Sequence, residues 1–290
     1  MSVVERVAAA PISWGVCEVP GWGHQLPPER VLSEMRDIGV AATEFGPEGF
    51  LPNQPQAKAE LLAAYHLKAV GGFVPVVLHD PGHDPLPEVD RALDGFVAAG
   101  AGVLVLAAAT GQQGYDSRPD LDETGWKTVL SNLDRLAGHA ADRGVAATLH
   151  PHVGTMIENR DEVHRVLDGC GVPLCLDTGH LLIGGTDPVA LTREAPDRIA
   201  HTHLKDVDAA LAARVQGGDM TYTDAVRDGI YRPLGQGDIG IAAIITTLED
   251  HGYTGWYVME QDTILAAEQT GDGPAGDVRT SIDYLRGLGR

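Results

Sequence analysis

The chain has few cysteines, no long hydrophobic run and no leader-like start. Its three cysteines, Cys17, Cys170 and Cys175, are too few and too irregularly spaced for a disulfide framework. No apolar stretch approaches the roughly 20 residues that are needed to cross a bilayer, so we expect no membrane association. The opening MSVVERVAAAPISWG lacks a basic segment followed by a long apolar one. We therefore expect a cytoplasmic protein.

Basic residues are scarce as well. The 21 Lys and Arg residues are outnumbered by 41 Asp and Glu, which gives a formal net charge of −20. A protein that binds a phosphate backbone needs clustered Lys and Arg, so nucleic acid is excluded as an expected partner. The acidity is most simply explained by solubility, although it also disfavours a polyanionic substrate. The hydrophobic fraction of 43% and the charged fraction of 21% are those of an ordinary globular protein.

Short strand-like segments alternate with amphipathic helical segments along the whole chain. The predicted strands are residues 7–14, 40–45, 68–78, 102–108, 145–150, 173–177, 199–204 and 255–260. The predicted helices are residues 28–38, 56–67, 87–99, 123–143, 160–168, 188–193, 241–251 and 276–288. Runs such as VLVLAA and VPLCL are continuously apolar, as expected of parallel strands that are buried on both faces.

This alternation favours a closed (β/α)₈ barrel, the TIM barrel of the α/β class, over an open parallel sheet. No GxGxxG or P-loop sequence opens a helix, so a dinucleotide-binding sheet lacks its usual motif. No linker divides the chain, and we expect a single domain over residues 1–290. Residues 205–240, after the seventh strand, are far longer than an ordinary connection, and we predict that they form a lid over the barrel mouth.

Histidines and carboxylates follow the predicted strands at the end where a barrel gathers its active site. They are Glu44 near the end of the second strand, His79 after the third, His150 and His152 at the end of the fifth, Asp177 and His180 at the end of the sixth, His203 and Lys205 at the end of the seventh, and Glu260 at the end of the eighth. Any single histidine here is more simply a hydrogen-bonded structural residue. A structural role is harder to accept for all of them, because four successive strands each place a histidine or a carboxylate at the same end. Buried charges are costly unless they bind something.

Two imidazoles with two carboxylates suit Mn²⁺, Co²⁺, Fe²⁺ or Zn²⁺ better than Ca²⁺. In the sequence His201-Thr202-His203, the two histidine side chains face the same way because strand side chains alternate. His203 lies nearer the rim and is the predicted ligand, with His201 below it. Cys175 stands in an apolar run, and we interpret it as a small core residue.

Six segments carry a family resemblance. They are residues 10–14 (APISW), 43–46 (TEFG), 150–155 (HPHVGT), 176–181 (LDTGHL), 201–207 (HTHLKDV) and 260–262 (EQD). In this order they resemble the xylose isomerase-like superfamily of sugar isomerases and epimerases, and within it the inosose dehydratases. The resemblance implies a TIM barrel that holds one divalent metal ion through four side chains of strands five to eight. The matching positions are His150, Asp177, His203 and Glu260.

The resemblance also implies catalytic roles for His152, His180 and Lys205. Ketose epimerases of this fold carry a glutamate on strand five, whereas this chain has His150 there. The strand-eight segment also departs from the dehydratase pattern, because Glu260 is the only glutamate available in it. We expect His152 to be the base, and His180 or Lys205 to be the acid.

We predict a metal-dependent dehydratase, a hydro-lyase that acts on a 2-keto polyol such as an inosose through a metal-stabilised enolate. Mn²⁺ or Co²⁺ is the preferred metal, with Zn²⁺, Fe²⁺ and Mg²⁺ as alternatives. Trp14, Glu44 and His79 are the predicted substrate-binding residues, although Trp14 would also suit the core. The partner is a small polyol or keto-sugar, and the family often forms homo-oligomers.

Two other functions stay open at this point. One is a sugar epimerase or isomerase of the same superfamily, which would share the enolate but return the proton instead of expelling hydroxide. The other is a metal-stabilised polyol-binding protein without catalysis. The presence of His152, His180 and Lys205 beyond the expected metal ligands argues against the binding protein.

Overall fold

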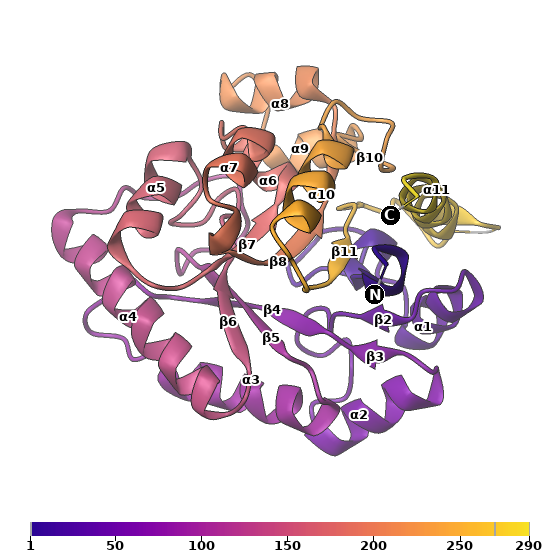
Figure 1. The fold of residues 1–290 in the computed structure, drawn as a ribbon, viewed down its shortest axis with the longest axis horizontal. Coiled ribbons are helices and arrows are strands. Elements are labelled where there is room, and N and C mark those ends of the chain that lie inside the picture. The colour runs from indigo at the N-terminus through magenta and orange to yellow at the C-terminus, as the bar shows by residue number, and fades with distance from the viewer. Residues whose placement is uncertain (1, 270, 290) are drawn as a thin grey trace.

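The strands form one parallel barrel, with helices packed around it (Figure 1). The computed structural model describes residues 2–269 and 271–289. The nine strands of the sheet are β1 (Val7–Ala9), β2 (Ala42–Thr43), β3 (Lys68–Ala69), β4 (Gly71–Val76), β5 (Val103–Ala108), β6 (Ala146–Leu149), β7 (Leu174–Asp177), β8 (Ile199–Leu204) and β11 (Tyr257–Met259). Only Val70 separates β3, which pairs with β2, from β4, which pairs with β5. The nine strands therefore occupy eight barrel positions, and the predicted TIM barrel is confirmed.

Helices cover the outside of the barrel at the predicted places. They are α1 (Pro28–Asp37), α2 (Pro55–Ala64), α3 (Leu86–Ala99), α4 (Glu123–Asp142), α5 (Arg160–Gly169), α7 (Pro188–Glu194), α10 (Ile241–Asp250) and α11 (Gly273–Gly287). Capping residues explain several of their starts: Asp122 accepts from the Gly125 N–H, and Asn159 forms a capping box with Glu162. No helix in the described part of the chain is long and apolar enough to cross a membrane.

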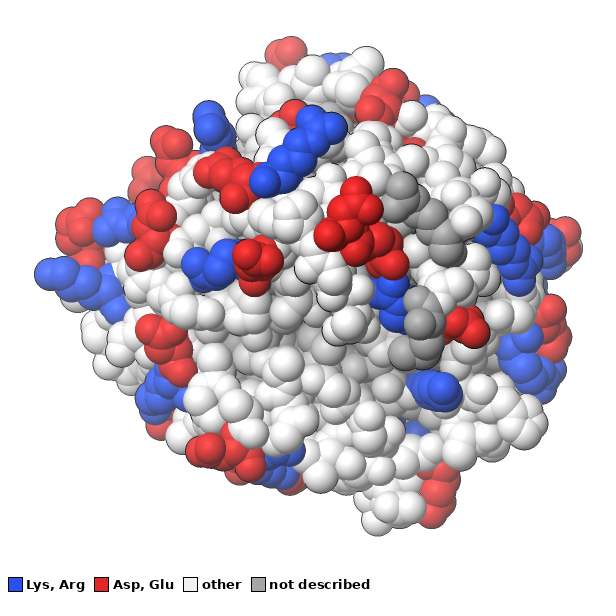
Figure 2. All heavy atoms as spheres, viewed as in Figure 1, with Lys and Arg blue, Asp and Glu red and all other residues white. Residues whose placement is uncertain are grey.

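The surface does not gather its charges by sign on the face seen in Figure 2. Acidic and basic side chains are interspersed there, with uncharged surface between them. On this face the excess of acidic residues is spread out, and no basic stripe of the kind that tracks a phosphate backbone is visible.

Small side chains fill part of the barrel interior below its mouth. Ala8, Ala10, Ala42, Val70 and Val258 form a buried cluster of their own. Because strand side chains alternate, Ala42 lies one layer below residue 44 and Val258 one layer below residue 260. The narrow apolar layer thus supports a layer of polar side chains at the carboxyl ends of the strands.

The first predicted strand is too long. β1 ends at Ala9, and Pro11–Trp14 forms the 3₁₀ helix η2 instead of continuing the strand. Pro11 has no N–H with which to extend the ladder, and Gly15 ends the turn with φ at 78°, in the left-handed region that favours glycine. The chain therefore turns before Trp14, which changes the direction of that side chain.

Residues 205–240 are folded, where the sequence predicted a single long loop. This segment contains β9 (Asp206–Val207), α8 (Ala209–Gln216), α9 (Tyr222–Arg227) and β10 (Tyr231–Arg232), and β9 pairs with β10 in an antiparallel manner. A further short helix, α6 (Thr178–Ile183), follows β7 directly and was not predicted. Movement of residues 205–240 as a lid stays a prediction.

Asp206 ties the end of this segment to its beginning. Its buried carboxylate accepts hydrogen bonds from the backbone N–H groups of Val207, Gly235, Gly237 and Ile239 at 2.8–3.0 Å. Gly237 must lack a side chain, because a Cβ there would lie 2.4 Å from Asp206 Oδ1. One carboxylate thus links residues 235–239 to the start of the segment through hydrogen bonds.

We expect Asp206→Ala to loosen residues 205–240, because buried N–H groups left without an acceptor cost about 1–3 kcal/mol each. Limited proteolysis should cut the variant within this segment faster than the wild type, and its melting temperature should fall. Asp238→Ala is the matched control, since it removes one exposed hydrogen bond to the Ala209 N–H. Equal cleavage rates of the Asp206 and Asp238 variants would show that Asp206 does not hold the two ends of this segment together.

Candidate active site

A pocket opens at the carboxyl ends of the barrel strands. Its polar lining includes six of the predicted site residues, which are Glu44, His150, His152, His203, Lys205 and Glu260. Asp177 and His180 are buried directly behind them, within contact distance of His150 and Lys205. The apolar lining includes Ile12, Val16, Trp22 and Phe73. The structure therefore brings eight of the ten predicted residues together.

The four predicted metal ligands converge. His150 Nε2 lies 3.0 Å from Asp177 Oδ2, and His203 Nδ1 lies 3.3 Å from Glu260 Oε2 and 3.6 Å from Asp177 Oδ2. Neighbouring ligand atoms around one ion are about 3.0–3.6 Å apart when the metal–ligand bonds are about 2.0–2.2 Å. β7 and β8 set this spacing, because Asp177 and His203 are partners in their register. The cluster could hold a single metal ion.

The charge and the free donor atoms of the cluster also fit a divalent ion. His203 Nδ1, the nitrogen that faces Asp177 and Glu260, is buried and has no hydrogen-bond partner among the described residues. Burial raises the pKa of Glu260 to about 7 and outweighs the opposing effects of His203 and Lys205, while Glu44 and Asp177 raise this pKa a little further. A cation among these carboxylates would relieve their repulsion and favour the deprotonated form.

Lys205 already supplies one positive charge to this region. Its Nζ lies 2.5 Å from Asp262 Oδ1, 3.1 Å from Glu260 Oε2 and 3.5 Å from Asp177 Oδ2. Burial alone would lower the pKa of Lys205, but these three carboxylates raise it well above its ordinary value. Glu44 is a fourth buried carboxylate of the site, and its partners are His201 and His203. The local charge is therefore negative even when Lys205 is protonated.

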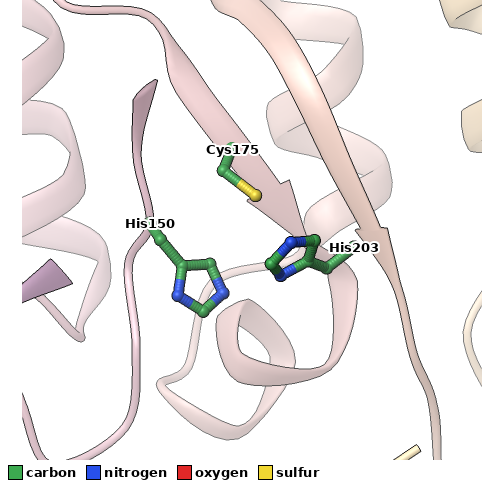
Figure 3. Close-up of side chains that lie close together, drawn as sticks. All are labelled: His150, Cys175 and His203. Atoms are coloured by element: carbon green, nitrogen blue, oxygen red, sulfur yellow. The ribbon is translucent and has the colours of Figure 1, made fainter. Parts of the chain in front are cut away.

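Cys175 and His201 lie one layer below the predicted ligands. Figure 3 shows Cys175 on β7 with its sulfur directed toward His150 and His203. Burial raises the pKa of Cys175 to about 12, so without a metal ion the group is a neutral thiol near pH 7. His201 is fully buried, and its Nε2 lies 2.7 Å from Glu44 Oε1. Both residues lie where strand alternation predicts them.

His152 has one ring nitrogen fixed and one available. Its Nδ1 lies 2.6 Å from the carbonyl oxygen of Val153, and because a carbonyl only accepts, Nδ1 must carry the proton. The ring stacks on His180 at 3.7 Å between centroids and contacts the Tyr115 ring at 4.3 Å. Burial, and then the neighbouring His150 and Lys205, hold the pKa of His152 well below its ordinary value. His152 is therefore uncharged near pH 7, with Nε2 as its basic atom.

His180 and Lys205 belong to a buried polar chain. His180 Nε2 lies 3.2 Å from Lys205 Nζ, and Lys205 also contacts Asp262. The Tyr222 hydroxyl donates to Asp262 Oδ2 at 2.7 Å and lies 3.0 Å from the Tyr231 hydroxyl. A Cβ at residue 179 would meet Lys205 and Tyr231 at 2.7 and 2.8 Å, so only glycine fits between them. This explains the glycine of the segment LDTGHL.

The structure does not bring Trp14 or His79 to the pocket. Trp14 is fully buried in the core, and its indole N–H donates to Glu34 Oε2 of α1 at 2.8 Å. The η2 turn directs Trp14 away from the mouth, and Trp22 lines the pocket in its place. His79 follows β4 but lies outside the pocket lining, where Phe73 provides the wall instead. The Phe73 ring packs edge-on against His150 at 5.7 Å. Neither residue therefore lines the pocket in which the sequence placed it.

The sequence did not identify four further residues that line the pocket or contact its lining. Asp262 could have been found, since it stands two residues after Glu260 and shares its side of the chain. Tyr115, Tyr222 and Tyr231 could not, because they come from long connections whose folding brings them to the site. No spacing along the chain indicates that contact.

The chain is similar to known proteins over most of its length. The rhizopine catabolism protein MocC of Rhizobium meliloti is 34% identical over 270 residues, which cover 89% of this chain and 81% of that protein. Inosose dehydratase of Geobacillus kaustophilus (strain HTA426) is 30% identical over 280 residues, covering 91% of this chain and 90% of that enzyme.

The fold has solved counterparts as well. The crystal structure of the protein IolI with a bound zinc atom superposes with a TM-score of 0.71, covering 98% of this chain and 99% of that one. Its sequence identity of 15% supports the fold alone. A family model described as xylose isomerase-like TIM barrel matches residues 32–288. The chain belongs to the xylose isomerase-like TIM barrel family.

Proposed function

We propose that this chain is a metal-dependent hydro-lyase that removes water from a 2-keto polyol such as an inosose. The observation that carries the proposal is the pairing of an uncharged base, His152, with a protonated lysine, Lys205, in one pocket. Elimination of water needs both a group that accepts a proton and a group that donates one. The similarity to an enzyme named inosose dehydratase over 91% of this chain supports the same reaction class.

His150, Asp177, His203 and Glu260 would hold the metal ion. Their mixture of imidazole nitrogen and carboxylate oxygen suits a borderline divalent ion, with Mn²⁺ or Co²⁺ preferred over Zn²⁺, Fe²⁺ or Mg²⁺. When bound, such an ion supplies Lewis acidity that polarises a ketone and acidifies the neighbouring C–H bond.

His152 takes the proton from the carbon next to the ketone. Its Nε2 has a free lone pair because Nδ1 donates to the Val153 carbonyl. The contacts with His180 and Tyr115 hold the ring in one orientation. A base whose direction is fixed in advance loses little entropy when the substrate arrives.

Lys205 donates the proton with which the β-hydroxyl leaves as water. The carboxylates of Asp262, Glu260 and Asp177 keep the ammonium protonated until the leaving group departs. His180, 3.2 Å from Lys205 Nζ, lies close enough to share that proton. The hydrogen bond from Tyr222 to Asp262 holds the carboxylate that orients Lys205.

The carboxylates of the pocket favour elimination over epimerisation. An epimerase that relays protons between two carboxylates needs a second free carboxylate on the opposite face of the substrate. Glu44 accepts from two histidines, Asp262 is held by Lys205 and Tyr222, and Glu18 accepts from the Tyr115 hydroxyl. Apart from the proposed ligand Glu260, every pocket-lining carboxylate among the described residues is thus engaged.

A product analysis tests the proposed reaction. Metal-loaded protein in D₂O should convert an inosose to a product lighter by one water, with the absorbance of an enone or dione. A panel of inososes and ketohexoses extends the test to the epimerase alternative. A stereoisomer that carries solvent deuterium and has lost no water would replace the dehydratase by an epimerase.

We predict that Asp177→Asn abolishes binding of the metal ion, because an amide cannot supply the charge that balances the cation. Elemental analysis after dialysis against Mn²⁺ should find one ion per chain in the wild type and almost none in the variant. Cys175→Ala is the control and should keep its metal, since the thiol is not a ligand in this assignment. Loss of metal only in the Cys175 variant would instead support binding by His150, Cys175 and His203.

We predict that His152→Ala keeps its metal but exchanges the substrate C–H proton about 10²–10⁴-fold more slowly, the usual contribution of a general base. Exchange into D₂O, followed by NMR on an inosose, measures this step apart from water loss. His164→Ala, which changes a half-buried histidine of α5, should exchange at the wild-type rate. An unchanged exchange rate in the His152 variant would assign the base to another residue.

A further inference from the structure

We propose that Glu44 is a positioning residue that makes Nδ1 the nitrogen through which His203 binds the metal ion. This inference rests on the metal site of the proposed function. It also changes the role predicted from the sequence, in which Glu44 binds substrate. The relevant contacts join side chains from β8 to the end of β2 inside the barrel.

Two imidazoles share one oxygen of Glu44. Glu44 Oε1 lies 2.7 Å from His201 Nε2 and 3.1 Å from His203 Nε2, and all three side chains are buried. An ionised carboxylate only accepts hydrogen bonds, so each histidine must donate from Nε2. A histidine that binds a metal ion is neutral and has one N–H, and because Nε2 keeps it for Glu44, Nδ1 is the atom of His203 that can bind the ion. The hydrogen bond therefore selects the tautomer.

That free nitrogen faces the other proposed ligands. His203 Nδ1 lies 3.3 Å from Glu260 Oε2 and 3.6 Å from Asp177 Oδ2, and it has no hydrogen-bond partner in the described part of the chain. The two nitrogens of one ring thus have separate partners: Nε2 points to Glu44 and Nδ1 to the metal position. Carboxylate partners of this kind orient a ligand histidine and make it more basic.

Glu44, His201 and His203 also form a compact group of potential ligands, so a second metal site has to be weighed. The contacts of 2.7 and 3.1 Å from Glu44 are those of N–H···O hydrogen bonds. An ion in that place would displace the protons that these bonds require. It would also leave His203 Nε2 as a ligand of one ion and Nδ1 of another. The geometry therefore favours one ion per chain, with Glu44 behind its ligand.

The test is the affinity of the protein for Zn²⁺, measured by competition with a chromophoric chelator. Glu44→Gln should bind Zn²⁺ about 10–100-fold more weakly than the wild type, the usual effect of losing such a partner. Glu44→Asp keeps the charge and should recover part of the affinity. His201→Leu is the matched control, since it removes the other donor and leaves Glu44 free to accept from His203; its affinity should stay close to that of the wild type.

Each other outcome overturns the inference. Wild-type affinity in Glu44→Gln, with a raised KM, would make Glu44 a substrate ligand. Two Zn²⁺ ions per wild-type chain, with one lost in His201→Leu, would establish a second metal site. If the Glu44 variants do not fold, ¹⁵N NMR of the histidines in the Zn²⁺-loaded wild type decides, and coordination of His203 through Nε2 would disprove the assignment.

The same measurements separate this inference from the proposed function. A wild type that binds no Zn²⁺, or an Asp177→Asn variant that keeps it, would remove the metal site on which both depend. A wild type that binds Zn²⁺ normally, with Glu44→Gln unaffected, would remove only the role of Glu44.

Discussion

Four carboxylates are buried together at the mouth of the barrel, and the rest of the site follows from the need to balance them. Glu44, Asp177, Glu260 and Asp262 are each less than a tenth exposed. Isolated ionised groups are very costly to bury, so each needs positive charge or hydrogen-bond donors close by. Asp262 has Lys205 and Tyr222, and Glu44 has two imidazoles. Asp177 and Glu260 share Lys205 with Asp262 and both face His203 Nδ1, so they are the two carboxylates best placed to bind a divalent ion.

Asp177 connects this electrostatic balance to the fold. Its Oδ1 accepts from the His180 N–H and caps α6, while its Oδ2 faces His150, His203 and Lys205. The same carboxylate therefore begins a helix and contributes to the site. Because the cap fixes the side chain, Oδ2 is directed toward the pocket before any ligand arrives. Such preorganisation reduces the cost of binding a cation.

Local patterns in the sequence predicted those parts of the site that depend on a single strand. The carboxyl ends of β6, β7 and β8 carry their polar residues where the apolar runs stop, so His150, Asp177 and His203 could be placed together. Trp14 was misplaced because Pro11 converts the expected strand into a 3₁₀ turn. Proline lacks the N–H that a strand needs to continue its ladder, so the apolar pattern of residues 7–14 does not by itself predict one strand.

Other contacts depend on how the barrel closes, which no local pattern encodes. Glu44 is 159 positions from His203 in the sequence, and they meet because β2 and β8 both direct side chains into one interior. Likewise, Tyr222 reaches Asp262 only because residues 205–240 fold into helices and a strand pair held by Asp206. Sequence periodicity gives the face on which a residue lies, but not the partner across the barrel.

The proposed chemistry is thus set by few side chains on a common scaffold. The family resemblance implies that ketose epimerases have a glutamate at the position of His150. With histidine there, this chain has one negative charge and one carboxylate acid–base group fewer. Two residues further on, His152 has a free nitrogen and a fixed ring, so it can serve as the base without also binding the metal. Lys205 then provides a proton on a residue that Asp262 holds in place. An imidazole base with an ammonium acid can complete the loss of water, whereas the two-carboxylate relay of an epimerase would lack its second free carboxylate here.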